Sequence, residues 1–292
     1  MAFAILTDTS ANLPAYLIKK FNIGVIPFFY TVNDNRAAIK EEEDFDGETF
    51  YNNMREGAEI NTSQIPPQRY IDFMEPYLTK GEDVLLISMS SGISGSCNSA
   101  EMAAAELREK YPERKIYIFD TLAASLGEGI LVLKAFDFKA LGATIDQTVE
   151  KLNELRKRMY QVFTVSDLKY LMRTGRISKI IAAVGTALNL KPILKGNEQG
   201  QIIQYSRVRG RRKSVETLAE RYNELVSEPG SQVVGIAHAD CPDDAKRLVD
   251  LLNEKNPPKE IITVCYEPIT GSHVGPGTLA LFFLGDTDVR AK

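Results

Sequence analysis

The fold is indicated first by one stretch of the sequence, Asp83-Val84-Leu85-Leu86-Ile87-Ser88-Met89-Ser90-Ser91-Gly92-Ile93-Ser94-Gly95-Ser96. Its apolar part predicts a buried strand, its small residues predict a loop, and a helical pattern begins near Cys97. Such a loop offers backbone N–H groups and hydroxyls, and the helix dipole adds partial positive charge. The stretch therefore predicts a strand–loop–helix unit that can hold a small anion.

Around this unit, strand-like and helix-like segments alternate through the first half of the chain. The alternation is typical of a parallel sheet covered by helices on both faces, which makes three layers. We expect strands at 3–7, 23–32, 84–89 and 116–120, and helices at 14–20, 45–55, 67–79, 100–110 and 123–141.

The pattern changes near residue 142, where a charged amphipathic helix begins. Two strand-like segments joined by the turn Gly196-Asn197-Glu198-Gln199-Gly200 predict a hairpin, and hence a mixed sheet. We therefore expect two α/β domains, residues 1–158 and 159–292, with a ligand between them. In the second half we expect strands at 161–165, 191–195, 201–206, 232–237 and 260–265, helices at 144–159, 168–190, 213–226 and 243–253, and an apolar C-terminal run at 278–285.

Composition excludes several classes of protein. The chain has 292 residues, 44% of them hydrophobic, and a formal net charge of −4, which argues against a nucleic-acid partner. No apolar run approaches the roughly 18 residues of a membrane span. The N-terminal residues lack a basic segment, so we expect a strand there and no signal peptide. Three scattered cysteines predict a cytoplasmic protein without disulfides or a zinc site.

Several polar segments follow predicted strands, where ligands collect in open α/β sheets. Each segment alone is explained by helix capping, but their number favours a binding site. The segment Asn61 to Pro67 is either a capping loop or a second set of hydroxyl donors that faces Ser94. The segments at strand ends are Asp8-Thr9-Ser10, Ser90 to Ser96, Asp120-Thr121, Thr164 to Asp167, His238-Ala239-Asp240 and Gly271 to Gly277.

Familiar catalytic motifs are absent or incomplete. The chain has neither a phosphate loop nor a dinucleotide fingerprint, and its two histidines, His238 and His273, have no metal-ligand spacing. Gly92-Ile93-Ser94-Gly95 misses the hydrolase elbow by one residue, so a serine hydrolase that uses Ser94 stays open. The basic cluster Arg207 to Lys213 is either a solvated surface or a docking patch for a phosphate or an acidic partner.

Four motifs in this order resemble those of the DegV family of bacterial fatty-acid-binding proteins, and the resemblance covers essentially the whole chain. It implies two α/β domains that bury a long-chain fatty acid, such as palmitate, between them. The motifs are Thr62-Ser63-Gln64, Ser90 to Gly95, Tyr170-Leu171 with Gly175-Arg176-Ile177-Ser178, and Gly271 to Leu281 (GSHVGPGTLAL).

The resemblance also implies roles for individual residues. Thr62 and Ser94 would hold the carboxylate, with Ser63, Gly95 and His273 as second choices. Arg176 and Arg209 would engage a partner or the acyl phosphate, because some members of the family carry the acyl group for a separate fatty acid kinase. No catalytic residue, metal or cofactor is implied.

The chain departs from the family pattern at three places. Ile65 stands where proline commonly follows the first motif, and Met172-Arg173-Thr174 replaces a more usual Lys-Lys-Gly. Glu128 stands between Gly127 and Gly129, where an apolar residue is common, and it leaves chain length and ligand class open.

Burial of the tail alone explains the affinity of such a carrier. Removing about fifteen methylenes from water gains roughly 12 kcal/mol, at ~0.8 kcal/mol each, before binding entropy is subtracted. Hydroxyls and N–H groups then suffice to pair the carboxylate. Two other classes remain as alternatives: a serine esterase or acyltransferase that uses Ser94, and an anion- or nucleotide-binding regulator.

Overall fold

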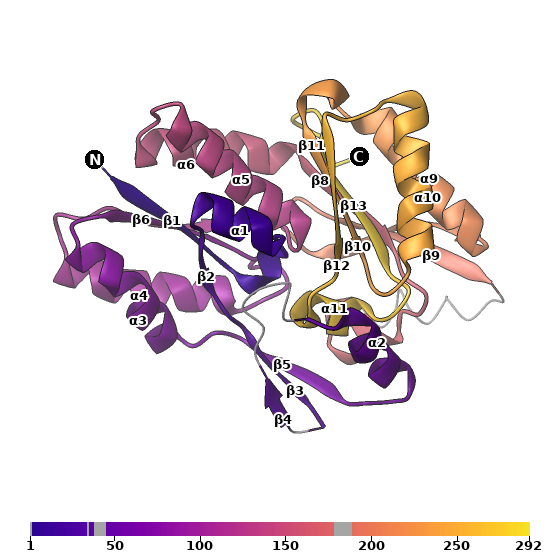
Figure 1. Cartoon of the computed structure of the whole chain (residues 1–292), viewed down its shortest axis with the longest axis horizontal. Helices are drawn as coiled ribbons and strands as arrows, with labels where there is room; N and C mark the ends of the chain where they lie inside the picture. Colours follow the sequence, from indigo (N-terminus) through magenta and orange to yellow (C-terminus); the bar gives the residue numbers. More distant parts are fainter. Residues whose placement is uncertain (1, 34, 38–44, 178–188) are drawn as a thin grey trace.

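The structure of the chain, a computed structural model, describes residues 2–33, 35–37, 45–177 and 189–292. Figure 1 shows two sheets side by side, with the N-terminal sheet on the left. This sheet is parallel and has the strand order β2-β1-β6-β7, so the expected parallel sheet is confirmed. Its elements are β1 (Phe3–Asp8), η1 (Thr9–Ala11), α1 (Ala15–Phe21), β2 (Gly24–Ile26), α3 (Pro67–Thr79), β6 (Asp83–Ser88), α4 (Ser96–Lys110), β7 (Ile116–Asp120), α5 (Leu126–Ala140) and α6 (Ile145–Arg158).

The second sheet has six strands in the order β10-β9-β8-β13-β11-β12, and it is mixed as expected. Only the pair β11–β12 is parallel; the predicted hairpin is the antiparallel pair β9–β10. Helices α9 and α10 pack together beside this sheet (Figure 1). The elements are β8 (Met159–Thr164), α7 (Lys169–Arg173), β9 (Leu190–Gly196), β10 (Ile202–Arg209), α9 (Arg211–Leu225), η3 (Pro229–Ser231), β11 (Val233–His238), α10 (Pro242–Lys255), β12 (Glu260–Cys265), α11 (Pro268–Val274) and β13 (Leu279–Leu284).

A small antiparallel sheet, β4-β3-β5, projects below the two larger ones (Figure 1). Its strands are β3 (Phe29–Val32), β4 (Asn35–Ala37) and β5 (Ile60–Ser63), and α2 (Gly47–Arg55) lies between β4 and β5 in the chain. This sheet was not expected. Segment 23–32 is two strands in different sheets, because Pro27, which has no N–H to donate, stands between β2 and β3.

Three further expectations need correction. Segment 61–67 was expected as a loop, but Thr62 lies within β5, paired with Tyr30. His273 was placed in a loop and lies on helix α11. The helix expected at 168–190 is α7 up to Arg173, followed by Gly175 at φ 71°; residues 178–188 lie outside the described part of the chain.

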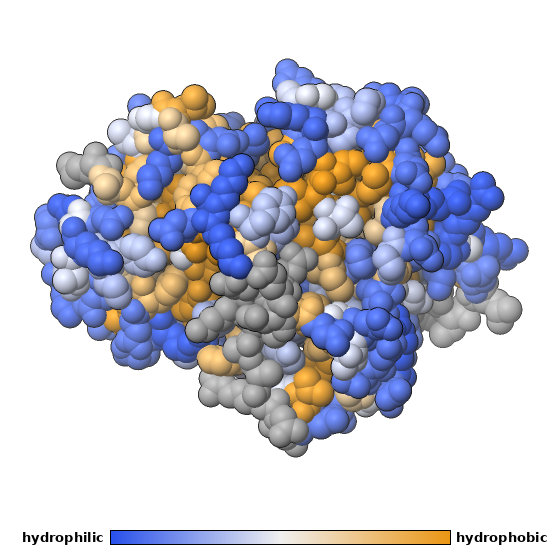
Figure 2. Space-filling view, viewed as in Figure 1, coloured by the Kyte–Doolittle hydropathy of each residue, from blue (hydrophilic) through white to orange (hydrophobic). Residues whose placement is uncertain are grey.

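Helix α5 lies between the two large sheets and packs against strands of both (Figure 1). Residues 126–132, in its first turns, are all buried, as expected for a helix that packs on several sides. Close packing needs glycine: a Cβ on Gly129 would stand 2.5 Å from the carbonyl oxygen of Ala11, and one on Gly235 would stand 2.7 Å from Cβ of Leu126. On the face drawn in Figure 2, hydrophilic side chains cover most of the surface, and apolar ones appear near the middle.

Arg290, near the C-terminus, ties several loops together. Its guanidinium is buried (4% exposed) and donates only to backbone carbonyls, among them those of Leu122 (2.6 Å), Asn197 (2.7 Å) and Met159 (3.3 Å). Burial, with the nearby charge of Arg156, lowers the pKa of Arg290 to about 10. Because Leu122 precedes α5 and Asn197 lies in the β9–β10 turn, Arg290 joins the two halves.

We propose that the domain boundary lies where α6 ends and β8 begins, near residue 158.

Candidate functional site

A cavity of about 160 Å³ lies where β5, the loop after β6, and α11 meet. It contains nearly all of the site residues predicted from the sequence, and we call it the head-group cavity. Because these residues come from both halves of the chain, the site requires the whole fold. The predicted residues in its wall are Thr62, Ser63, Ser94, Gly95, Arg176 and His273.

Ser94 is held by its own loop at the N-terminus of α4. Its N–H donates to the carbonyl of Ser90 (3.1 Å), and its Oγ accepts from the N–H of Ser96 (3.2 Å). The Ser94 hydroxyl proton therefore remains free for an acceptor in the cavity. The N–H of Ile65, where proline is more usual, donates to Oγ of Ser96 (3.2 Å), so this departure strengthens the link between β5 and α4.

The β9–β10 hairpin fixes the same loop from the other half of the chain. Oγ of Ser90 donates to the carbonyl of Gly200 (2.9 Å). Gly200 has φ 71°, and a Cβ there would stand 2.1 Å from Oγ of Ser90, so only glycine fits. On the opposite side, the Asp120 carboxylate accepts from the hydroxyl and the N–H of Ser91 (2.5 and 3.2 Å). The loop is therefore held by hydrogen bonds from both halves of the chain.

Thr62 contacts His273, with 2.9 Å between Oγ1 and Nε2. Burial, with the positive charges of Arg176 and Arg173, lowers the pKa of His273 to about 3, so the ring is neutral at neutral pH. If Nε2 carries the proton, it donates to Thr62, and the Thr62 hydroxyl can then donate to an anion. The opposite tautomer would use up the Thr62 proton. An anion at Thr62 would therefore favour the Nε2–H form, in which His273 would orient Thr62.

Arg176 brings positive charge to the wall of the head-group cavity. It is half-buried, and it donates to the carbonyls of Ile93 (3.3 Å) and Thr174 (2.5 Å). Thr174, another departure from the family pattern, caps α7 through a bond to the carbonyl of Tyr170 (3.0 Å). Ser178, the last residue of the Arg176 motif, lies outside the described residues.

Arg209 does not reach this cavity. It is exposed at the far end of β10 from Ile202, which does line the cavity. At about 3.3 Å per residue, the two ends of the strand are roughly 23 Å apart. The structure therefore separates Arg209 from the other predicted residues, and its position suits contact with a partner more than contact with the head group.

The geometry gives little support to a serine hydrolase. Among the residues that the structure describes, neither histidine forms a hydrogen bond with Ser94: His273 contacts Thr62, and Nδ1 of His238 accepts from the N–H of Cys241. A nucleophilic serine requires a base within hydrogen-bond reach. The Ser94 hydroxyl, which accepts from the N–H of Ser96, keeps a proton that it can donate.

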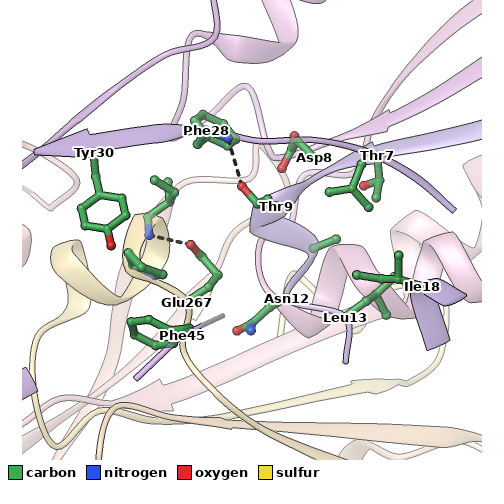
Figure 3. Close-up of a pocket in the computed structure, with 14 residues that line it drawn as sticks. Thr7, Asp8, Thr9, Asn12, Leu13, Ile18, Phe28, Tyr30, Phe45 and Glu267 are labelled. Carbon is green, nitrogen blue, oxygen red and sulfur yellow. Dashed lines mark hydrogen bonds between the residues drawn. The ribbon is translucent and has the colours of Figure 1, made fainter. Parts of the chain in front are cut away.

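A second cavity, of about 30 Å³, adjoins the first, and sequence reasoning missed it (Figure 3). Phe28 and Ile269 line both cavities, so they form the wall where the two meet. We call the second one the inner cavity. Of its wall, the sequence marked only the segment Asp8-Thr9-Ser10, because the other residues come from short segments far apart in the chain. Its apolar walls are Ala11, Leu13, Ile18, Val25, Phe28, Tyr30, Phe45, Pro268 and Ile269, and Thr7, Asp8, Thr9, Asn12 and Glu267 add polar groups.

Glu128 is fully buried in α5 and does not line the head-group cavity. It belongs to a cluster in which Oγ of Ser10 lies 2.7 Å from Glu128 Oε2 and 2.5 Å from Asp8 Oδ1, while Thr7 Oγ1 donates to Glu128 Oε1 (3.0 Å). A serine hydroxyl has one proton, so one of the two carboxyls must donate to it. Burial, reinforced by the charge of Asp8, raises the pKa of Glu128 well above its usual range. Glu128 is therefore the protonated partner.

Glu128→Gln is expected to flatten the pH dependence of stability. The pKa of Glu128 is raised in the folded state above its ordinary value of 4.5, so the folded protein keeps a proton that the unfolded chain loses. Stability is therefore full below pH 4.5 and falls as pH rises toward the raised pKa, by up to about 1.4 kcal/mol per pH unit. Glutamine keeps the donor to Ser10 and cannot ionise.

Urea unfolding between about pH 5 and about pH 8 measures this effect as the slope of the unfolding free energy. Glu154→Gln is the matched control, because Glu154 is exposed on α6 and should leave the wild-type slope unchanged. Equal slopes in the wild type and in Glu128→Gln would show that Glu128 is not the proton holder.

Two further features bear on the class of the protein. No helix among the described residues is long and apolar enough to cross a membrane. Within the same part of the chain, no group of three or more His, Cys, Asp or Glu side chains could hold a metal ion.

Comparison with known proteins agrees with the motifs. A family model described as "Uncharacterised protein, DegV family" matches residues 2–286. A DegV domain-containing protein of Clostridium perfringens is 37% identical over 285 residues, 98% of each chain, and a fatty acid-binding protein of Thermotoga maritima is 33% identical over 96% of each chain. The solved structure of a DegV family protein from Thermus thermophilus, described for its fatty acid binding, has a TM-score of 0.88 at 28% identity, over 98% of this chain and 100% of its own. This chain therefore belongs to the DegV family.

Proposed function

We propose that this protein binds a long-chain fatty acid, such as palmitate, with the carboxylate at Thr62 and Ser94. The tail would run toward Phe28 and Ile269, and the inner cavity, of about 30 Å³, would take only part of it. The observation that carries the proposal is that the polar head-group cavity adjoins the largely apolar inner cavity. A cavity whose wall carries two hydroxyl donors, Thr62 and Ser94, shares Phe28 and Ile269 with a second cavity that is bounded largely by apolar side chains.

The energetics suit a carrier. The tail supplies affinity by leaving water, and the head group needs only partners that replace its hydration. Thr62 and Ser94 donate two hydrogen bonds to the carboxylate, and Arg176 adds a positive potential from the wall. Charge-assisted bonds of this kind are about twice as strong as neutral ones. The relatives from Thermotoga maritima and Thermus thermophilus, described as binding fatty acids, support the same ligand class.

We further propose that the carboxylate is presented to a separate fatty acid kinase, so that catalysis belongs to the partner. An open groove of about 640 Å³ borders the head-group cavity and shares Ser94 and Arg176 with it. Through this groove a kinase could reach the carboxylate, and hydroxyl donors leave its oxygens free to attack a phosphoryl group. Arg209, exposed on β10, would contact the partner. An ATP-dependent partner and three cysteines that form no disulfide fit a cytoplasmic location.

Native mass spectrometry of the protein expressed in bacteria tests the ligand. We expect a bound mass equal to that of an acid of about fourteen to eighteen carbons, because the gain from burying such a tail makes release slow. Added palmitate should restore the same mass shift in protein stripped of lipid. Protein that stays free of ligand under gentle conditions, and takes up no added fatty acid, would contradict the proposal. Labelling of Ser94 by a fluorophosphonate would point to an esterase.

A further inference from the structure

The inner cavity contains polar groups that a hydrocarbon tail does not need. Tyr30 lies in its wall with only 8% of its surface exposed, and among the described residues its hydroxyl has no hydrogen-bond partner. Thr9 accepts from the N–H of Phe28 through Oγ1 (3.1 Å), so its own hydroxyl proton is unused. Figure 3 shows Tyr30, Thr9 and the Glu267 carboxylate around one space.

Glu267 can still accept a hydrogen bond. Its two carboxylate oxygens cap α11 by accepting from the N–H groups of Ile269 (2.5 Å) and Thr270 (2.7 Å). A carboxylate oxygen has two lone pairs, so each oxygen keeps capacity for a further donor. Burial raises the pKa of Glu267 to about 7, and its charge, after burial, is the second cause that raises the pKa of Tyr30. The Tyr30 hydroxyl, which can donate, and the Glu267 carboxylate, which can accept, therefore face the same cavity.

At this position the hydroxyl of Tyr30, and not its ring, needs an explanation. The ring packs edge-on against Phe50, with 5.9 Å between centroids, and phenylalanine would make the same contact. The Tyr30 hydroxyl is not among the fully buried polar groups without a partner, so it faces open space and can pair with a group that enters the cavity. The Tyr30 hydroxyl therefore points to a polar group that the bound molecule supplies.

We propose that Tyr30, Thr9 and Glu267 form a second polar subsite, which binds a hydroxyl group carried by the acyl chain. A ligand hydroxyl can donate to Glu267 while it accepts from Tyr30 or Thr9. The cavity of about 30 Å³ has room for such a group. A carboxylate is excluded from this subsite because Glu267 and Asp8 would repel it. The inference rests on the proposed function, and it narrows the ligand from fatty acids in general to hydroxylated ones.

The pairing of β3 with β5 limits where along the acyl chain this hydroxyl can lie. Tyr30 is directly opposite Thr62 in the β3–β5 pair, so both side chains project from the same face, with Cβ atoms roughly 5 Å apart. The subsite lies beyond Phe28 and Ile269 when seen from the head-group cavity. The ligand hydroxyl therefore belongs on the chain and away from the carbon next to the carboxylate.

The test compares palmitic acid with a series of acids of the same length that carry one hydroxyl, moved stepwise along the chain. Calorimetry should show one position that binds about tenfold tighter than palmitic acid, the effect of one net hydrogen bond. In Tyr30→Phe, that advantage should fall to about threefold or less, while palmitic acid binds at least as tightly as before. Tyr16→Phe, which removes an exposed hydroxyl from α1, should change neither value.

Two results would overturn the subsite and leave the proposed function intact: palmitic acid binds and no hydroxylated acid exceeds it, or the advantage survives in Tyr30→Phe. If neither palmitic acid nor any hydroxylated acid binds the wild type, the proposed function fails and the subsite fails with it. Circular dichroism of Tyr30→Phe checks the fold, and palmitic acid binding confirms that its pocket is intact.

Discussion

Replacing Thr62 and Ser94 together by alanine weakens fatty acid binding by about a hundredfold or more, if these hydroxyls hold the carboxylate. Each hydrogen bond to a charged group contributes about 1.5–3 kcal/mol, so losing two costs about 3–6 kcal/mol, or roughly 10² to 10⁴ in Kd. The effect is large because the apolar tail must still be buried, which pulls a carboxylate without partners into the cavity. Displacement of a fluorescent fatty acid measures the change.

The double variant should keep its fold. Thr62 and Ser94 are only partly buried, and the Ser90 to Ser96 loop keeps its bonds to Gly200 and Asp120. The melting temperature of lipid-free protein should therefore stay close to that of the lipid-free wild type. Unchanged affinity in a folded double variant would place the carboxylate elsewhere.

Arg209→Ala is the matched control for the division of roles. Since Arg209 is exposed and far from the cavity, this variant should bind fatty acid like the wild type. Phosphorylation of the bound acid by the proposed kinase partner should fall. If Arg209→Ala lost lipid and the double variant kept it, the assignment of the two sites would be reversed.

Arg290→Ala is expected to lower the free energy of unfolding by about 3 kcal/mol, because several buried carbonyls lose their donor at once. Among them are those of Leu122, Asn197 and Met159, which lie on three separate segments. A guanidinium with five N–H groups can join so many carbonyls, and an alanine leaves them to compete for water. Urea unfolding gives the value.

Arg212→Ala is the comparison for this measurement. Arg212 is on the exposed side of α9, paired with Glu216, and its loss should cost less than about 0.5 kcal/mol, as is usual for surface ion pairs. Equal stability in Arg290→Ala and Arg212→Ala would mean that the carbonyls around Arg290 find other donors, and that the C-terminal segment is dispensable for joining the halves.

The sequence predicted those elements whose defining residues are adjacent in the chain, and it missed elements that are defined by pairing with distant strands. The unit β6–loop–α4 was predictable because an apolar run, small residues and a helical pattern follow one another directly. The hairpin β9–β10 carries its turn residues between two apolar runs. Strand β5 was missed because it is short and is defined by pairing with β3, some thirty residues earlier.

The site divides in the same way. Thr62, Ser94 and His273 were predicted because they stand in motifs, and the structure brings all three to one cavity. Of the wall of the inner cavity, the sequence marked only the segment Asp8-Thr9-Ser10, because Thr9, Tyr30 and Glu267 meet only through tertiary packing. Likewise, Glu128 could be noticed as unusual, but its partners Thr7 and Ser10 lie 121 and 118 positions away. Nothing in the order of residues could have shown which groups surround it.

The placement of α5 limits how this protein can evolve. A substitution on α5 changes its fit to both sheets at once, since Gly129 stands against η1 and Leu126 against Gly235 of β11. The two halves therefore cannot accumulate changes independently, although each has its own sheet. Chimaeras that join the first half of one family member to the second half of another should inherit mismatches along this helix. Two halves should be compatible only when they come from family members whose residues along α5 match.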